Sequence, residues 1–189
     1  MEQKVFGTEQ AIAVLNDSGI GVLPTDTVYG VVAKATERIA VERLYTLKQR
    51  ERKPGTIVAV SVAQLISLGI SEDYLKKGEK YWPGPLSIVL SLEGKYSYIH
   101  QGVGTVAVRV VADERLRGIL RQTGPLVTSS ANHPGRPEAT TVQEAINYFG
   151  AEVDFYVDGG DLSGRAASTI IRVDGDKIEI IRDGAVKLI

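Results

Sequence analysis

Hydrophobic residues along this chain follow two alternating spacings. Ala11, Ile12 and Leu15 share one face of a helix, which we expect to begin at Thr8 as its N-cap. Residues 19–23 follow as a short, continuous apolar run, which is typical of a buried strand. A helix that leads directly into a buried strand indicates an α/β arrangement.

The same two spacings recur to the end of the chain. Further helices are expected after Thr36, after the N-caps Ser61 and Asp113, over residues 72–80, and after the capping box of residues 141–144. The expected strands are residues 56–60, 86–92, 105–110, 125–127, 154–157, 168–173 and 177–181. The last two strands are joined by the hairpin signal Asp174-Gly175 and must be antiparallel, whereas the early strands could pair in parallel. We therefore predict an α/β fold with a twisted, mixed parallel/antiparallel sheet flanked by helices.

Composition narrows the class of protein. The length of 189 residues suits a single domain, and we expect residues 1–189 to form one. Cysteine is absent, which excludes disulfides, thiolate nucleophiles and Cys-based metal sites. The polar N-terminus and the absence of an apolar run of about 18 residues predict a cytoplasmic protein with no membrane span. The net charge of −1 does not favour a dedicated nucleic-acid binder, although residues 48–53 (KQRERK) form a local basic cluster.

Two strands run directly into polar sequence. Leu23 leads into PTDT at residues 24–27, and Val127 leads into TSSAN at residues 128–132. Ligands of α/β folds gather at the carboxyl ends of strands, where hydroxyl and amide groups offer neutral hydrogen bonds. Taken alone, either stretch could equally be a helix cap or a turn.

Charged residues add a second clue. Lys48, Arg50 and Arg52 crowd the end of a predicted helix, where they complement the helix dipole or form a phosphate site. Beside strand-end hydroxyls, such a cluster suits a nucleotide. The chain has no GxxxxGK[ST] loop, and the GVGTVA of residues 102–107 precedes a strand instead of following one, so we reject it as a dinucleotide motif. Arg109 interrupts an apolar strand and needs a carboxylate partner, either a ligand or an internal salt bridge.

Seven short motifs together resemble a known family. They are PTDTVYG (24–30), KQR (48–50), WPGPL (82–86), VAVR (106–109), SSAN (129–132), STII (168–171) and RDGAV (182–186). In this order they resemble the YrdC-type threonylcarbamoyl-AMP synthases from about residue 8 to residue 189. The chain resembles the short, TsaC-like bacterial form, which has no additional C-terminal domain.

The resemblance implies a nucleotidyltransferase with a YrdC-like fold and a concave basic cavity. Its substrates would be ATP with Mg²⁺, L-threonine and bicarbonate or CO₂, and its products threonylcarbamoyl-AMP and pyrophosphate. Partner proteins would transfer the threonylcarbamoyl group to ANN-decoding tRNA.

The resemblance also assigns residues to the two substrates. The expected ATP-binding residues are Lys48, Arg50, Arg52, Ser130, Asn132 and Arg182. The expected L-threonine-binding residues are Thr25, Thr27, Arg109, Thr128 and Ser168. No protein nucleophile is required, no side chain is assigned as a base or metal ligand, and Asp26 is expected to orient its loop.

Two alternatives differ in class. A non-catalytic paralogue would bind tRNA or double-stranded RNA through the basic cluster, and retention of Lys48, Arg50, Ser130 and Asn132 argues for the enzyme instead. A carbamoyl-adenylate enzyme, like the related domain of hydrogenase-maturation proteins, would sit in a longer chain with zinc-finger cysteines, and this chain has none.

Overall fold

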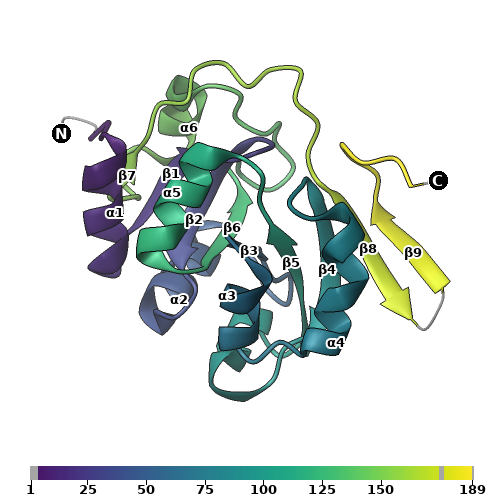
Figure 1. Cartoon of the computed structure of the whole chain (residues 1–189). Helices are drawn as coiled ribbons and strands as arrows, with labels where there is room; N and C mark the ends of the chain where they lie inside the picture. Colours follow the sequence, from purple (N-terminus) through teal and green to yellow (C-terminus); the bar gives the residue numbers. More distant parts are fainter. Residues whose placement is uncertain (1–3, 175–176, 189) are drawn as a thin grey trace.

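The computed structural model of the chain describes residues 4–174 and 177–188. Within these residues a single mixed sheet of nine strands is flanked by helices, in the order β7-β1-β2-β6-β3-β5-β4-β8-β9 (Figure 1). The predicted fold class is therefore confirmed. None of the described helices is long and apolar enough to cross a membrane.

The sheet combines parallel and antiparallel pairs. Its strands are β1 (Ile20–Pro24), β2 (Tyr29–Lys34), β3 (Thr56–Ala59), β4 (Leu86–Ser91), β5 (Thr105–Val110), β6 (Leu126–Ser130), β7 (Phe155–Tyr156), β8 (Thr169–Asp174) and β9 (Lys177–Arg182). The pairs β1–β7, β3–β5 and β4–β8 are parallel, and the remaining pairs are antiparallel. The predicted hairpin signal Asp174-Gly175 falls partly outside the described residues, but β8 and β9 pair antiparallel as predicted.

Helices connect most of the strands. They are α1 (Thr8–Asn16), α2 (Arg38–Leu47), α3 (Val62–Ser67), α4 (Glu72–Leu75), α5 (Glu114–Thr123) and α6 (Val142–Phe149), with 3₁₀ helices η1 (Lys76–Tyr81) and η2 (Gly94–His100). Three predicted N-caps are confirmed: the side chains of Ser61, Asp113 and Thr141 each accept a hydrogen bond from the backbone N–H three residues later.

Alternation along the strands divides the interior into two cores. In β1 and β2, Val22 and Val31 face one side of the sheet, whereas Leu23 and Val32 face the other. The smaller core packs under α1 and α5, and the larger core includes the apolar faces of α2 and α6. Strand β9 is exposed along its length, but where helices cover both faces of the sheet a ligand can reach it only at the strand ends.

Several local predictions were wrong. The N-cap of α1 is Gly7, and Thr8 is the first helical residue. Strand β2 is absent from the predicted strands, and it pairs antiparallel with β1 because only the short turn of residues 25–28 separates them; parallel pairing, as expected for early strands, joins β3 to β5. The helix predicted for residues 72–80 is divided into α4 and η1, where Gly78 admits the close approach of the Trp82 ring.

One long connection crosses the end of the sheet. Residues 157–168 run from β7, near one edge, to β8, near the other (Figure 1). The buried hydroxyl of Tyr29 anchors this connection, because it donates to the carbonyl of Gly160 at 2.8 Å and accepts from the N–H of Gly159 at 2.8 Å. The connection ends at Ser168, which is buried and lines the candidate site.

Candidate functional site

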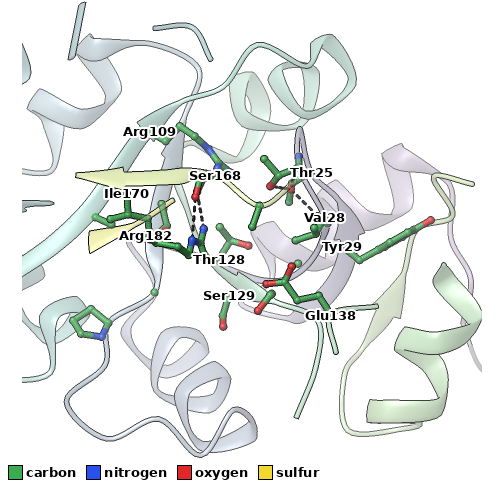
Figure 2. A pocket seen from close by; sticks show the side chains of 18 of the residues that line it. Thr25, Val28, Tyr29, Arg109, Thr128, Ser129, Glu138, Ser168, Ile170 and Arg182 are labelled. Carbon is green, nitrogen blue, oxygen red and sulfur yellow. Dashed lines mark hydrogen bonds between the residues drawn. The ribbon is translucent and has the colours of Figure 1, made fainter. Parts of the chain in front are cut away.

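A cavity of about 200 Å³ opens where several strands end. The end of β1, the start of β2 and the end of β6 form one side, while β5, the start of β8 and the end of β9 form the other (Figure 2). Its polar lining residues are Thr25, Thr27, Tyr29, Arg50, Thr56, Arg109, Thr128, Ser129, Ser130, Glu138, Ser168 and Arg182. The cavity therefore combines hydroxyl groups with arginines.

The turn between β1 and β2 presents two of these hydroxyls. Thr25 Oγ1 donates to the carbonyl of Val28 at 2.7 Å and lies 3.1 Å from Thr27 Oγ1 (Figure 2). The Thr27 N–H donates back to Thr25 Oγ1 at 3.2 Å. Both threonines are buried and line the cavity, whereas the intervening Asp26 is not one of the lining residues. Thr25, Thr27 and Thr128, together with Arg109, are called the threonine wall below.

Asp26 meets Arg109 behind the threonine wall. Arg109 Nη2 lies 2.9 Å from Asp26 Oδ1, and the two side chains are 4% and 6% exposed. Burial raises the pKa of Asp26, and the charge of Arg109 opposes this rise. The sequence predicts that Arg109 pairs with either a ligand or an internal carboxylate, and Asp26 is that internal carboxylate. The side chain of Arg109 also lines the cavity.

Two further arginines that line the cavity donate to neutral acceptors. Arg50 donates from Nη1 to Ser129 Oγ at 2.6 Å and from Nε to the carbonyl of Lys53 at 2.7 Å. Arg182 donates from Nε to the carbonyl of Ser168 at 3.0 Å and from Nη2 to Ser168 Oγ at 2.9 Å (Figure 2). None of these hydrogen-bond partners carries a negative charge, so neither guanidinium group is bonded to a carboxylate through them, and Glu138 acts on Arg182 as a nearby charge. Arg50 and Arg182 are called the basic wall below.

Lys48 supports this basic wall from behind. Its ammonium group donates to the carbonyl of Ser130 at 2.7 Å, to Asn132 Oδ1 at 2.9 Å, and to the carbonyl of Asn132. Ser130 Oγ also donates to Asn132 Oδ1 at 2.9 Å. Burial, with a smaller contribution from the charge of Arg50, lowers the pKa of Lys48 to about 8. The Lys-x-Arg and Ser-x-Asn motifs are therefore bonded directly to each other.

Most of the residues predicted for the site are brought together. The cavity is lined by Thr25, Thr27, Arg50, Arg109, Thr128, Ser130, Ser168 and Arg182. Lys48 and Asn132 lie behind the lining, bonded to the end of β6. Arg52 is exposed and does not line the cavity.

Glu138 also lines the cavity, and it is not among the residues predicted from the sequence. It lies in the irregular segment between β6 and α6, and its side chain points into the cavity (Figure 2). Among the described residues that line the cavity, it is the one carboxylate. Mg²⁺ bound to a nucleotide uses substrate phosphates with one or two protein carboxylates, and Glu138 fits that role. No sequence motif marks this position, so only the fold could reveal it.

Histidines and metal-binding clusters do not contribute to this site. His100 Nδ1 accepts from the N–H groups of Gly102 and Gly104, and His133 Nε2 lies 2.9 Å from the carbonyl of Tyr148. Over residues 4–174 and 177–188, no group of three or more His, Cys, Asp or Glu side chains could hold a metal ion. The polar side chains that line the cavity are arginines, hydroxyls and the carboxylate of Glu138.

Comparison with known proteins places this site in a family. The family described as Sua5_yciO_yrdC, Telomere recombination, matches residues 13–184. The chain belongs to the Sua5/YciO/YrdC family. It is 33% identical over 194 residues to a putative threonylcarbamoyl-AMP synthase of Mycobacterium leprae, covering 99% of this chain and 87% of that protein. It is also 33% identical over 175 residues to the threonylcarbamoyl-AMP synthase of Idiomarina loihiensis, covering 89% and 93% of the two chains.

Solved structures of relatives share the fold. P. abyssi Sua5 complexed with L-threonine matches with a TM-score of 0.84 and 30% identity, over 94% of this chain and 54% of that one. This chain therefore spans about half the length of that relative. E. coli YciO matches with a TM-score of 0.83 over 95% of this chain and 90% of its own, and at 21% identity this likeness concerns the fold alone.

Proposed function

We propose that this chain is an L-threonylcarbamoyladenylate synthase, a nucleotidyltransferase that makes threonylcarbamoyl-AMP and pyrophosphate from L-threonine, bicarbonate or CO₂, and ATP. The observation that carries the proposal is the pairing of two unlike walls in one cavity. The basic wall offers two guanidinium groups that donate to neutral oxygens, and their positive charge suits a triphosphate. The threonine wall offers hydroxyls and a charge-balanced arginine, which suit an amino acid. The names of the relatives, including a Sua5 complexed with L-threonine, support this assignment.

The proposed reaction requires no protein nucleophile. The amine of L-threonine adds to CO₂, releases a proton and becomes a carbamate. A carbamate oxygen then attacks the α-phosphorus of ATP, the bond to the β-phosphate oxygen breaks, and pyrophosphate leaves. A site without cysteine and without a catalytic histidine is compatible with this chemistry.

The residues of the cavity would act by position and charge. Arg109 and the hydroxyls of Thr25 and Thr128 would hold the amino acid, so that its carbamate meets the α-phosphate. Arg50 and Arg182 would stabilise the negative charge that develops on the leaving pyrophosphate. Mg²⁺ on the phosphates would neutralise further charge, and Glu138 is the residue that would hold it.

The proposed product also implies its consumer. An acyl-type carbamoyl adenylate is an activated donor, so proteins that transfer the group to ANN-decoding tRNA would use it. Direct binding of tRNA by this chain forms no part of the proposal, because Arg50 lines the cavity and Lys48 is bonded to the end of β6 beside it.

Pyrophosphate release from ATP tests the proposed function directly. Release should require both L-threonine and bicarbonate, and Arg50→Ala should abolish most of it. Arg172→Ala is the matched control, because Arg172 is exposed on β8 and pairs with Glu179, outside the cavity. If folded wild type releases no pyrophosphate with all three substrates and Mg²⁺, the proposal is wrong. Tight, steeply salt-dependent RNA binding by that inactive protein would then indicate a binding paralogue.

A further inference from the structure

Asp26 occupies an unusual place beside the cavity. Its neighbours Thr25 and Thr27 line the cavity, while its own carboxylate meets Arg109, 2.9 Å away on β5. We propose that Asp26 is a positioning residue that orients Arg109 toward the α-carboxylate of the amino-acid substrate. This inference rests on the proposed function and deepens it, because it assigns selectivity for the amino acid to a residue that does not touch the substrate.

The ion pair with Asp26 does not satisfy every hydrogen-bond donor of Arg109. Within the described residues, Arg109 Nε has no hydrogen-bond partner, and neither carboxylate oxygen of Asp26 has a well-directed one. Arg109 is only 3% exposed, so a donor without a partner at this depth costs free energy. Because Nε is itself inaccessible, a substrate carboxylate that enters the cavity would instead meet the part of the Arg109 side chain that lines it. Asp26 therefore holds Arg109 at Nη2, while the Arg109 side chain also lines the cavity.

The positive charge of Arg109 gives a reason for its pairing with the carboxylate of Asp26. A buried guanidinium without a counter-ion is costly, and it would attract the phosphates of ATP as readily as an amino acid. The negative charge of Asp26 balances the positive charge of Arg109 at long range, but the N–H groups of Arg109 can still donate directed hydrogen bonds. Short-range, bidentate recognition of a carboxylate survives this cancellation, whereas non-directional attraction of a triphosphate does not.

Asp26 could instead serve stability alone, and the two roles predict different kinetics. A purely structural role would lower the folded fraction and leave the KM values of the folded enzyme unchanged. A positioning role raises the KM for L-threonine and leaves the KM for ATP unchanged, because the basic wall holds ATP.

The first experiment compares both KM values in wild type and in Asp26→Asn, which keeps the shape of the side chain. We expect the KM for L-threonine to rise about tenfold and the KM for ATP to change less than about twofold. Calorimetric titration should show that the variant distinguishes L-threonine from L-threoninamide, which lacks the carboxylate, less well than wild type. Asp26→Glu should restore part of that discrimination. Asp113→Asn is the control, because Asp113 influences Asp26 only through its charge and caps α5.

A double variant keeps the test decisive if Asp26→Asn folds poorly. Asp26→Asn combined with Arg109→Gln removes both charges, which avoids an unpaired buried ion. If Asp26 acts through Arg109, the double variant and Arg109→Gln alone should have the same KM for L-threonine. Different values in these two folded variants, or an unchanged KM in folded Asp26→Asn, would overturn the inference. A wild type that neither binds nor uses L-threonine would overturn the proposed function as well.

Discussion

The basic wall and the threonine wall use arginine in opposite ways. Arg50 and Arg182 donate to carbonyl and hydroxyl oxygens, which fix their direction without reducing their charge. Arg109 is fixed by the carboxylate of Asp26, which balances its charge. Within one cavity, the same side chain is therefore presented once as a free cation and once as a neutral pair.

This difference separates the two substrates by their charge. A triphosphate carries several negative charges and gains most from uncompensated cations. An amino acid needs directed donors for one carboxylate and acceptors or hydroxyls for its remaining groups. If the two walls were equally charged, ATP phosphates would compete for the amino-acid subsite.

The largest effect should follow from removal of a free cation. We expect Arg50→Ala to lower kcat/KM for ATP by about 100-fold, since hydrogen bonds to charged groups contribute about 1.5–3 kcal/mol each. The KM for L-threonine should change much less. Initial rates of pyrophosphate release over a matrix of both substrates would measure this, with Arg172→Ala as the unaffected control. An equal loss for both substrates would mean that the two walls do not divide the substrates.

Titration of Lys48 offers a second way to weaken the basic wall. Burial lowers the pKa of Lys48 to about 8, so its positive charge is complete below that pH and is lost as the pH rises above it. We expect the affinity for a fluorescent ATP analogue to fall about tenfold between pH 7 and pH 9. Binding is measured in place of turnover, because the threonine amine also titrates at alkaline pH. Lys48→Met should bind more weakly and show a flat profile, and a fall of equal size in this variant would assign the titration to another group.

The carboxylate in the cavity provides a smaller and more specific test. We expect Glu138→Gln to raise the Mg²⁺ concentration needed for half-maximal pyrophosphate release by about three- to tenfold, because Mg²⁺ on a nucleotide binds few protein carboxylates. Mn²⁺ binding in the presence of ATP, followed by electron paramagnetic resonance, gives a readout that is independent of activity. An unchanged metal requirement in both measurements would show that Glu138 does not hold the metal.

Local signals in the sequence sufficed for much of the fold. The strand of residues 105–110 matches the prediction, and the caps Ser61, Asp113 and Thr141 each mark a helix start. These features depend on spacing and capping within a few residues. Strand β2 was not predicted, because the turn of residues 25–28 carries neither glycine nor asparagine and gives no hairpin signal.

Contacts between residues far apart in the sequence limited how much of the site could be predicted. The sequence indicates that Arg109 needs a partner, but only the fold brings Asp26 to it from the turn after β1. Glu138 carries no local signal, because it lies in an irregular segment that folds back over the end of β6. Arg52 shows the opposite case: it shares the basic run with Lys48 and Arg50, yet it lies on the exposed side of that turn.

Arg52 therefore gives the smallest predicted effect and marks the edge of the basic wall. It is exposed, has a φ of 52°, and does not line the cavity. We expect Arg52→Asn to change the KM for ATP by less than about twofold, because exposed charges far from a ligand are screened. Asparagine is chosen because it tolerates the left-handed backbone, so strain does not confuse the result. A loss comparable to that of Arg50→Ala would mean that the loop of residues 50–54 moves to bring Arg52 onto the triphosphate, and the basic wall would then extend beyond the cavity.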